Sequence, residues 1–173
     1  MIKIIFLDFD GVINTLQIDN VPFDTVTGKI NHNGFFFNIC SPNDMKVSNR
    51  QAIMWLNKLC LETDAQIVIT STWRFDYDNA VAALYNSGLD KNIKIIGKTP
   101  YISLENRGLE INTFIENNLK NQEIKYVILD DDQDVSLEQK RHLVLCNTYN
   151  GFGFNEYNRA KNILNWFFYK NII

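Results

Sequence analysis

Residues 2–12 read Ile-Lys-Ile-Ile-Phe-Leu-Asp-Phe-Asp-Gly-Val, a short apolar run that leads directly into two aspartates and a glycine. The β-branched and apolar side chains of residues 2–7 are typical of a strand that is buried on both faces of a sheet. Side chains two positions apart on a strand point the same way, so Asp8 and Asp10 are expected to face one pocket. Gly11 permits a sharp turn there and brings backbone N–H groups close to the same point.

The Asp8–Asp10 pair gathers negative charge at the end of this strand. Two carboxylates so close repel each other unless a cation or a shared proton lies between them. Mg²⁺ resolves that conflict, because it prefers oxygen ligands and leaves room for a phosphate. The simpler interpretation is a pair of surface aspartates in a turn. A hydrophobic strand that runs directly into Asp-x-Asp-Gly favours the metal site.

Strand-like and helix-like stretches alternate along the rest of the chain. Strands are expected at 66–69, 93–96, 126–129 and 143–146, and helices after the capping box Ser48-Asn-Arg-Gln51 and at 78–86, 108–119 and 155–169. This alternation predicts an α/β fold, a three-layer Rossmann-like parallel sheet with helices on both faces. Such sheets place their active sites at the carboxyl ends of the strands.

The length of 173 residues suits a single domain with its own core. Residues 15–45 are long for a plain loop and are expected to form a flap or a small cap insert over the sheet end. The net charge of −3 excludes a basic coat for unspecific nucleic-acid binding. The cysteines Cys40, Cys60 and Cys146 are expected to be free thiols, and no apolar run is long enough to span a membrane, so we expect a cytoplasmic protein.

A hydroxyl cluster follows the second expected strand, in Ile67-Val-Ile-Thr-Ser-Thr-Trp-Arg74. Thr70 or Ser71 can donate a hydrogen bond to a phosphate oxygen, and Arg74 can add a bidentate contact. Ser71 or Thr72 can equally serve as a helix cap. The cluster alone does not decide between these two roles.

Two cations and a group of acids come later in the chain. Lys98 follows the third expected strand and Arg107 opens a helix, so either can hold a phosphate, although each alone is more often a solvated charge. Asp130, Asp131, Asp132 and Asp134 follow the fourth expected strand, which suits a metal site. A solvated acidic turn is the simpler interpretation, and for Asp132 it is preferred.

Together these four clusters resemble the haloacid dehalogenase (HAD) superfamily of phosphatases. The order is that of the superfamily: Asp-x-Asp-Gly-Val, a hydroxyl, a cation that opens a helix, and an acidic pair. The resemblance extends from Phe6 to the acids at Asp130. Finer features resemble the small HAD domains associated with bacterial and phage RNA repair proteins, namely Ile69-Thr-Ser-Thr-Trp-Arg74, Gly97-Lys-Thr-Pro100, Arg107-Gly-x-Glu110 and Leu129-Asp-Asp-Asp132.

The resemblance implies a role for each acid. Asp8 is the expected nucleophile, which forms an aspartyl-phosphate, and Asp10 is the expected general acid and base. Mg²⁺ is the expected cofactor, bound by Asp8, by the Asp10 backbone carbonyl and by an acid of the last cluster. Asp131 is the preferred acid, with Asp130 and Asp134 as close competitors. Because Asp10 is present to protonate a leaving oxygen, dehalogenation is not expected.

The resemblance also assigns the residues that hold the phosphate. Thr70 matches the hydroxyl position of the superfamily, and Arg107 best matches its cation, with Lys98 as the runner-up. An Arg at this position departs from the Lys of the superfamily pattern. The further expected phosphate contacts are Gly11, Ser71 and Arg74.

The predicted activity is therefore that of a Mg²⁺-dependent phosphomonoesterase. The expected substrate is a phosphorylated small molecule or a nucleic-acid end. The insert is too small for a large cap, so a partner domain is one expected source of a lid over the site. Trp73, Arg74 and Tyr101 are candidates to stack on a base or bind a second phosphate, and core packing is an equal alternative for Trp73. Alternative functions are a phosphatase of non-nucleotide metabolites, a receiver domain or a non-catalytic phosphate-binding module. The receiver ranks low, because no Asp ends the strands at 66–69 or 93–96.

Overall fold

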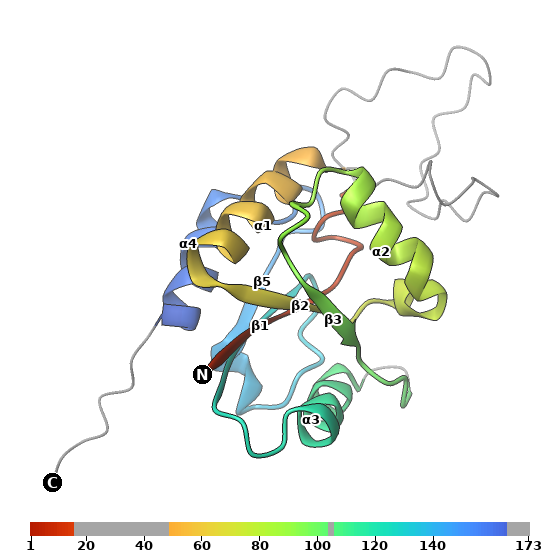
Figure 1. Ribbon diagram of the computed structural model, residues 1–173, viewed down its shortest axis with the longest axis vertical. Helices are drawn as coiled ribbons and strands as arrows, with labels where there is room; N and C mark the ends of the chain where they lie inside the picture. The colour runs from red at the N-terminus through yellow and green to blue at the C-terminus, as the bar shows by residue number, and fades with distance from the viewer. Residues whose placement is uncertain (16–48, 104–105, 166–173) are drawn as a thin grey trace, which may run out of the picture.

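A five-stranded parallel sheet forms the centre of the molecule (Figure 1). The computed structural model describes residues 1–15, 49–103 and 106–165. Within them the strand order is β3-β2-β1-β4-β5. The strands are β1 (Ile2–Leu7), β2 (Ala65–Ile69), β3 (Ile95–Lys98), β4 (Ile124–Asp130) and β5 (Leu143–Leu145). This sheet confirms the predicted α/β fold class.

Helices cover both faces of the sheet, which gives three layers (Figure 1). On one face lie α1 (Arg50–Thr63), α2 (Tyr77–Asn86) and α4 (Phe154–Asn165). On the other face lies α3 (Arg107–Asn118). Two short 3₁₀ helices, Thr72–Asp76 and Gln139–His142, follow β2 and precede β5.

The side chains of the central strand alternate between two apolar clusters. Ile5 and Leu7 are fully buried in the cluster beneath α1, α2 and α4. Ile4 and Phe6 are fully buried in the opposite cluster, against Phe114 of α3. Burying a side chain of this size contributes about 1.5–3 kcal/mol, so the strand that carries Asp8 is firmly anchored on both faces.

The start of α1 corrects one prediction. The N-cap is Asn49 and not Ser48, because the Asn49 side chain accepts a hydrogen bond of 2.9 Å from the backbone N–H of Ala52. Asparagine caps a helix as well as serine does, so the two neighbours were equivalent by residue type. Ser48 itself lies outside the described residues.

The third strand also begins later than predicted, at Ile95 and not at Ile93. A turn occupies the earlier position, where the N–H of Ile93 donates to the carbonyl of Asp90 over 3.0 Å. Ile93 is nevertheless buried, which explains why this position is apolar although it lies in a turn and not in the strand.

The expected flap at 15–45 lies outside the described residues apart from Thr15, as does Cys40. Cys60 and Cys146 are buried free thiols, as predicted. Among the helices that the structure describes, none has the length and apolar character needed to cross a membrane.

Candidate active site

The ends of three adjacent strands bring the predicted site residues together. Leu7 of β1 is in register with Ile69 of β2 and with Leu129 of β4. The residues that follow, Asp8, Thr70 and Asp130, therefore emerge side by side at the carboxyl edge of the sheet. Backbone hydrogen bonds continue past the strands, since Asp8 N–H donates to Leu129 over 3.0 Å and Thr70 N–H donates to Leu7 over 2.9 Å.

Arg107, the first residue of α3, joins these three strand ends. Its guanidinium lies 3.3 Å from Asp8 Oδ1 and 3.2 Å from Asp130 Oδ2. It also donates a hydrogen bond of 3.3 Å to Thr70 Oγ1. The Arg107 side chain is only 15% exposed, so this cation is held inside the site and not on the surface. The structure thus places the preferred cation beside the expected nucleophile.

Asp134 fixes the start of α3. One of its carboxylate oxygens accepts a hydrogen bond of 3.3 Å from the backbone N–H of Arg107, and its carbonyl accepts one of 3.2 Å from Gly108. An acceptor at the first turn satisfies N–H groups that have no partner within the helix. In the structure, Asp134 therefore positions Arg107.

Three carboxylates lie close together at the carboxyl edge of the sheet. Among the described residues, Asp8, Asp130 and Asp131 each offer an oxygen that lies within 4.8 Å of the other two. Asp131 is half-buried and accepts a hydrogen bond of 2.9 Å from the Thr148 hydroxyl. The carboxylates of Asp10 and Asp134 are not part of this group.

Gly11 packs directly against Asp131. A Cβ at this position would lie 2.0 Å from Asp131 Oδ2, and the backbone φ of +76° lies in the left-handed region. Both features require glycine here. The role that the structure supports for Gly11 is to leave space for a carboxylate of the acidic group.

The acidic group carries more negative charge than Arg107 balances. Burial, followed by the charge of Asp130, raises the pKa of Asp8 well above its usual range, although Arg107 opposes this. Burial likewise raises the pKa of Asp130 to about 6. Buried carboxylates that repel one another are stabilised by binding a proton or a cation.

The residues present fit a divalent cation of the Mg²⁺ type. Asp130 Oδ2 is buried and accepts no hydrogen bond, although Arg107 lies close to it. Carboxylate oxygens are the ligands that Mg²⁺ prefers. Asp8, Asp130 and Asp131 are the residues that would hold it.

Asp10 lies beside the acidic group and is held at both carboxylate oxygens. Oδ1 accepts a hydrogen bond of 3.2 Å from the side-chain amide of Asn14, and Oδ2 accepts one of 3.2 Å from the indole N–H of Trp73. Burial raises the pKa of Asp10, and these two hydrogen bonds oppose the rise. Asp10 is half-buried, so it remains accessible to a substrate.

Three predicted phosphate contacts are engaged elsewhere in the structure. Ser71 caps the 3₁₀ helix, because its hydroxyl accepts from the N–H of Trp73 over 3.3 Å. Arg74 is buried and forms an ion pair of 2.8 Å with Glu110. Lys98 is exposed and donates to the carbonyl of Arg74 over 2.8 Å.

Two residues contact the predicted site residues but are not themselves among those predicted from the sequence. Thr99 follows β3 as Thr70 follows β2, and its hydroxyl donates to Thr70 Oγ1 over 3.3 Å. A polar residue directly after a strand was the signal that could have identified it. Asn14 carried no such signal, because only the folded turn brings it back to Asp10.

An exposed aromatic pair lies at the same edge of the sheet. Phe75 and Tyr101 are 65% and 51% exposed, and their ring centroids are 5.2 Å apart. The guanidinium of Arg74 lies 5.8 Å and 5.6 Å from the two ring centroids. Arg74 also donates to the carbonyl of Thr70 over 2.9 Å, which links the pair to the Thr70 end of the site. We refer to Phe75 and Tyr101 as the aromatic pair.

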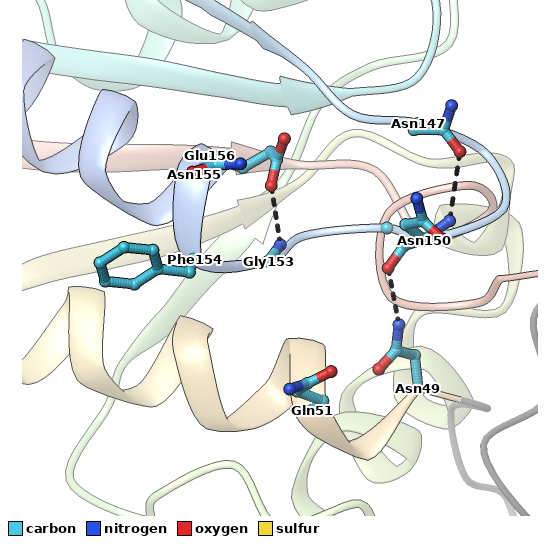
Figure 2. A pocket seen from close by; sticks show the side chains of 9 residues that line it. Asn49, Gln51, Asn147, Asn150, Gly153, Phe154, Asn155 and Glu156 are labelled. Carbon is cyan, nitrogen blue, oxygen red and sulfur yellow. Dashed lines mark hydrogen bonds between the residues drawn. The ribbon is translucent and has the colours of Figure 1, made fainter.

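A hollow of about 360 Å³ lies between the starts of α1 and α4 (Figure 2). Its amide side chains hold the chain in place, since Asn49 donates to the carbonyl of Asn150 over 3.1 Å and Asn147 accepts from the N–H of Asn150 over 3.3 Å. Asp8, Asp10, Asp130 and Asp131 do not line it. These contacts fix the loop that carries Thr148 to Asp131.

The comparisons with known proteins agree with this geometry. A family model described as the HAD domain in Swiss Army Knife RNA repair proteins matches residues 4–157. The match includes every residue of the site described above. Searches of curated proteins and of solved structures gave no match.

Proposed function

Because the chain belongs to the family of HAD domains found in Swiss Army Knife RNA repair proteins, we propose that it is a Mg²⁺-dependent phosphomonoesterase that acts on nucleotide or RNA ends. The observation that carries the proposal is the position of Asp8. It is buried at the end of the central strand, between the cation Arg107 and the acids Asp130 and Asp131. A carboxylate in this position is suited to attack a phosphoryl group.

In the proposed reaction, a carboxylate oxygen of Asp8 attacks phosphorus and the bond from phosphorus to the leaving oxygen breaks. The product is an aspartyl-phosphate, which water then hydrolyses. Arg107 and Thr70 contact each other, and Arg107 contacts Asp8. A phosphoryl group beside Asp8 would therefore lie within reach of both donors, which favour its charged oxygens.

Asp10 is the proposed general acid and base. It gives a proton to the leaving oxygen and later removes one from the attacking water. The raised pKa of Asp10, caused first by burial, increases the protonated fraction that the first step requires. Both acids of the motif have a raised pKa, so Asp8 relies on the positive charge of Arg107 and of a bound Mg²⁺ to work ionised, whereas Asp10 begins protonated.

Mg²⁺, when bound, would neutralise charge and orient the transferred phosphoryl group. Asp8 and Asp131 are the side chains that we propose to hold it, with Asp130 next to them. Asp131 is favoured over Asp130 because Asp131 is half-buried, whereas Asp130 is 1% exposed and its Oδ1 accepts a hydrogen bond of 3.0 Å from the N–H of Asp132.

The proposal of a nucleotide or RNA end draws on the aromatic pair as well as on the family. Exposed rings can stack on unpaired bases, and such stacking tolerates any sequence. Phe75 and Tyr101 are exposed at the edge of the sheet from which Asp8 and Thr70 emerge. This arrangement suits a chain end whose terminal phosphate enters the site while a base rests outside it.

Phosphate release from a panel of esters tests the proposal. The panel contains 3′- and 5′-phosphorylated oligoribonucleotides, a nucleoside monophosphate and a hexose phosphate, each with Mg²⁺ or with excess EDTA at one salt concentration. We expect Mg²⁺-dependent release that is fastest from a nucleotide or RNA end. Release in EDTA with verified absence of metal would disprove the metal proposal, and preference for the hexose phosphate would indicate a metabolite phosphatase.

A further inference from the structure

Trp73 links the 3₁₀ helix after β2 to the carboxylate of Asp10. Its indole N–H donates to Asp10 Oδ2 over 3.2 Å. From this contact we infer that Trp73 is a positioning residue, which holds Asp10 in the orientation from which it transfers a proton to the leaving oxygen. The inference rests on the proposed phosphatase function, and it adds a residue that does not itself touch the reacting atoms.

The indole ring is fixed from two further directions. It stacks on Phe9 with a centroid distance of 5.1 Å and an interplanar angle of 26°. Phe9 is fully buried, so this stack connects the ring to the core. The backbone N–H of Trp73 donates to Ser71 Oγ over 3.3 Å, which fixes the start of the 3₁₀ helix. A donor held in this way presents its N–H at a constant position.

The other oxygen of Asp10 is held differently. Asn14 donates to Oδ1 over 3.2 Å from the turn that follows the Asp motif, and the Asn14 carbonyl accepts from the N–H of Gly11. An amide can present either N–H or C=O, whereas an indole is a donor only. Oδ2 therefore remains the acceptor for Trp73 throughout, and Oδ1 is the oxygen suited to carry the transferable proton.

The proposed role has a measurable consequence because proton transfer depends strongly on geometry. General acid–base catalysis contributes roughly 10²–10⁴-fold in rate, and a misplacement of about 1 Å can cost about 10²-fold. A departing alkoxide needs the proton of Asp10, whereas a departing nitrophenolate is stable without it. Loss of positioning should thus slow the cleavage of alkyl phosphates selectively.

The first test is Trp73→Phe, which removes the N–H and retains an aromatic ring on Phe9. The measured quantity is kcat/KM, which covers the steps up to departure of the leaving group, for a phosphorylated oligoribonucleotide and for p-nitrophenyl phosphate. We expect a fall of about tenfold or more for the oligonucleotide and a fall of less than about threefold for the aryl ester. Trp55→Phe is the matched control, since Trp55 also packs against aromatic rings, those of Phe154 and Tyr157, and should leave both values unchanged.

The outcome that overturns the inference is an equal effect of Trp73→Phe on both esters, or no effect on either. A second measurement does not depend on activity or on the folding of that variant. In a ¹⁵N-labelled protein, Asp10→Ala should move the indole N–H resonance of Trp73 upfield, because its acceptor is lost, and leave that of Trp55 in place. An unchanged Trp73 resonance would refute the contact, whereas an inactive wild-type protein with the expected shift would refute only the phosphatase function.

Discussion

Asp8 is the residue on which the proposed chemistry depends, and its surroundings make its replacement informative. Asp8→Asn removes the nucleophile and one of several mutually repelling negative charges. We expect turnover to fall by at least about 10³-fold, the scale of loss when a nucleophile is removed from an enzyme. The melting temperature should not fall, because burial and neighbouring acids already disfavour the ionised form of Asp8. Normal turnover, with deamidation excluded by mass spectrometry, would contradict the assignment.

Gly11 is the second residue whose replacement separates two effects. Gly11→Ala places a Cβ 2.0 Å from Asp131 Oδ2, whereas Gly88→Ala meets no atom within 4 Å, and both positions have a positive φ. Each variant should lose about 1–2 kcal/mol of stability from backbone strain. Only Gly11→Ala should also weaken Mg²⁺ binding and activity. Titration of Mg²⁺ in a phosphate-release assay measures the difference, and equal titrations for both variants would argue against Asp131 as a ligand.

At the scale of elements, the ion pair between Arg74 and Glu110 ties the 3₁₀ helix after β2 to α3. Both side chains are buried, and the N···O distance is 2.8 Å. Glu110→Gln leaves a buried guanidinium without its counter-charge, which typically costs about 3–5 kcal/mol. Chemical denaturation should show this loss, and Lys58→Gln, which removes one exposed ion pair of Glu62 and leaves its pair with Lys161, should show little change. Equal stabilities of the two variants would contradict a structural role for Arg74.

The elements also show what the sequence could predict and why. The ends of β1, β2 and β4 were predictable, because an apolar run followed by a polar residue marks the carboxyl edge of a parallel strand. The sequence alone therefore predicts that Asp8, Thr70 and Asp130 lie at this edge. The direction of a side chain beyond the strand end has no such periodic signal. For this reason the ion pair of Arg74 with Glu110 and the contact of Trp73 with Asp10 became visible only in the structure.

At the scale of the whole molecule, the site makes stability depend on pH and on Mg²⁺. The pKa of Asp130 is about 6 in the folded protein, against about 3.9 in an unfolded chain. Between these values the folded state binds more protons, so the stability of the metal-free protein falls as the pH rises through this window. Above it, Mg²⁺ should restore stability by taking the place of the proton.

Thermal denaturation in EDTA and in Mg²⁺, at about pH 7.5 and about pH 5, measures this dependence. In EDTA, the wild-type protein should lose more stability between the lower and the higher pH than the Asp130→Asn variant does, because only the wild type has the Asp130 carboxyl group. Mg²⁺ should raise the wild-type melting temperature more at the higher pH than at the lower one. An identical pH profile for wild type and Asp130→Asn would exclude Asp130 as the group responsible.

The overall placement of the aromatic pair leads to the last prediction, which concerns substrate preference. Phe75 and Tyr101 come from segments that follow β2 and β3, the two strands that lie on one side of β1, and Asp8 follows the end of β1. Stacking of a base on an aromatic ring is worth about 1–3 kcal/mol, so the double variant Phe75→Ala, Tyr101→Ala should lower kcat/KM for a phosphorylated oligoribonucleotide by about tenfold or more. It should leave a hexose phosphate unaffected, because that ester has no base. Phe154→Ala removes a similarly exposed ring, 58% accessible, at the start of α4 and is the matched control. If the double variant lowers kcat/KM equally for both substrates, or for neither, the aromatic pair does not contact a base. The phosphatase assignment is unaffected by that result.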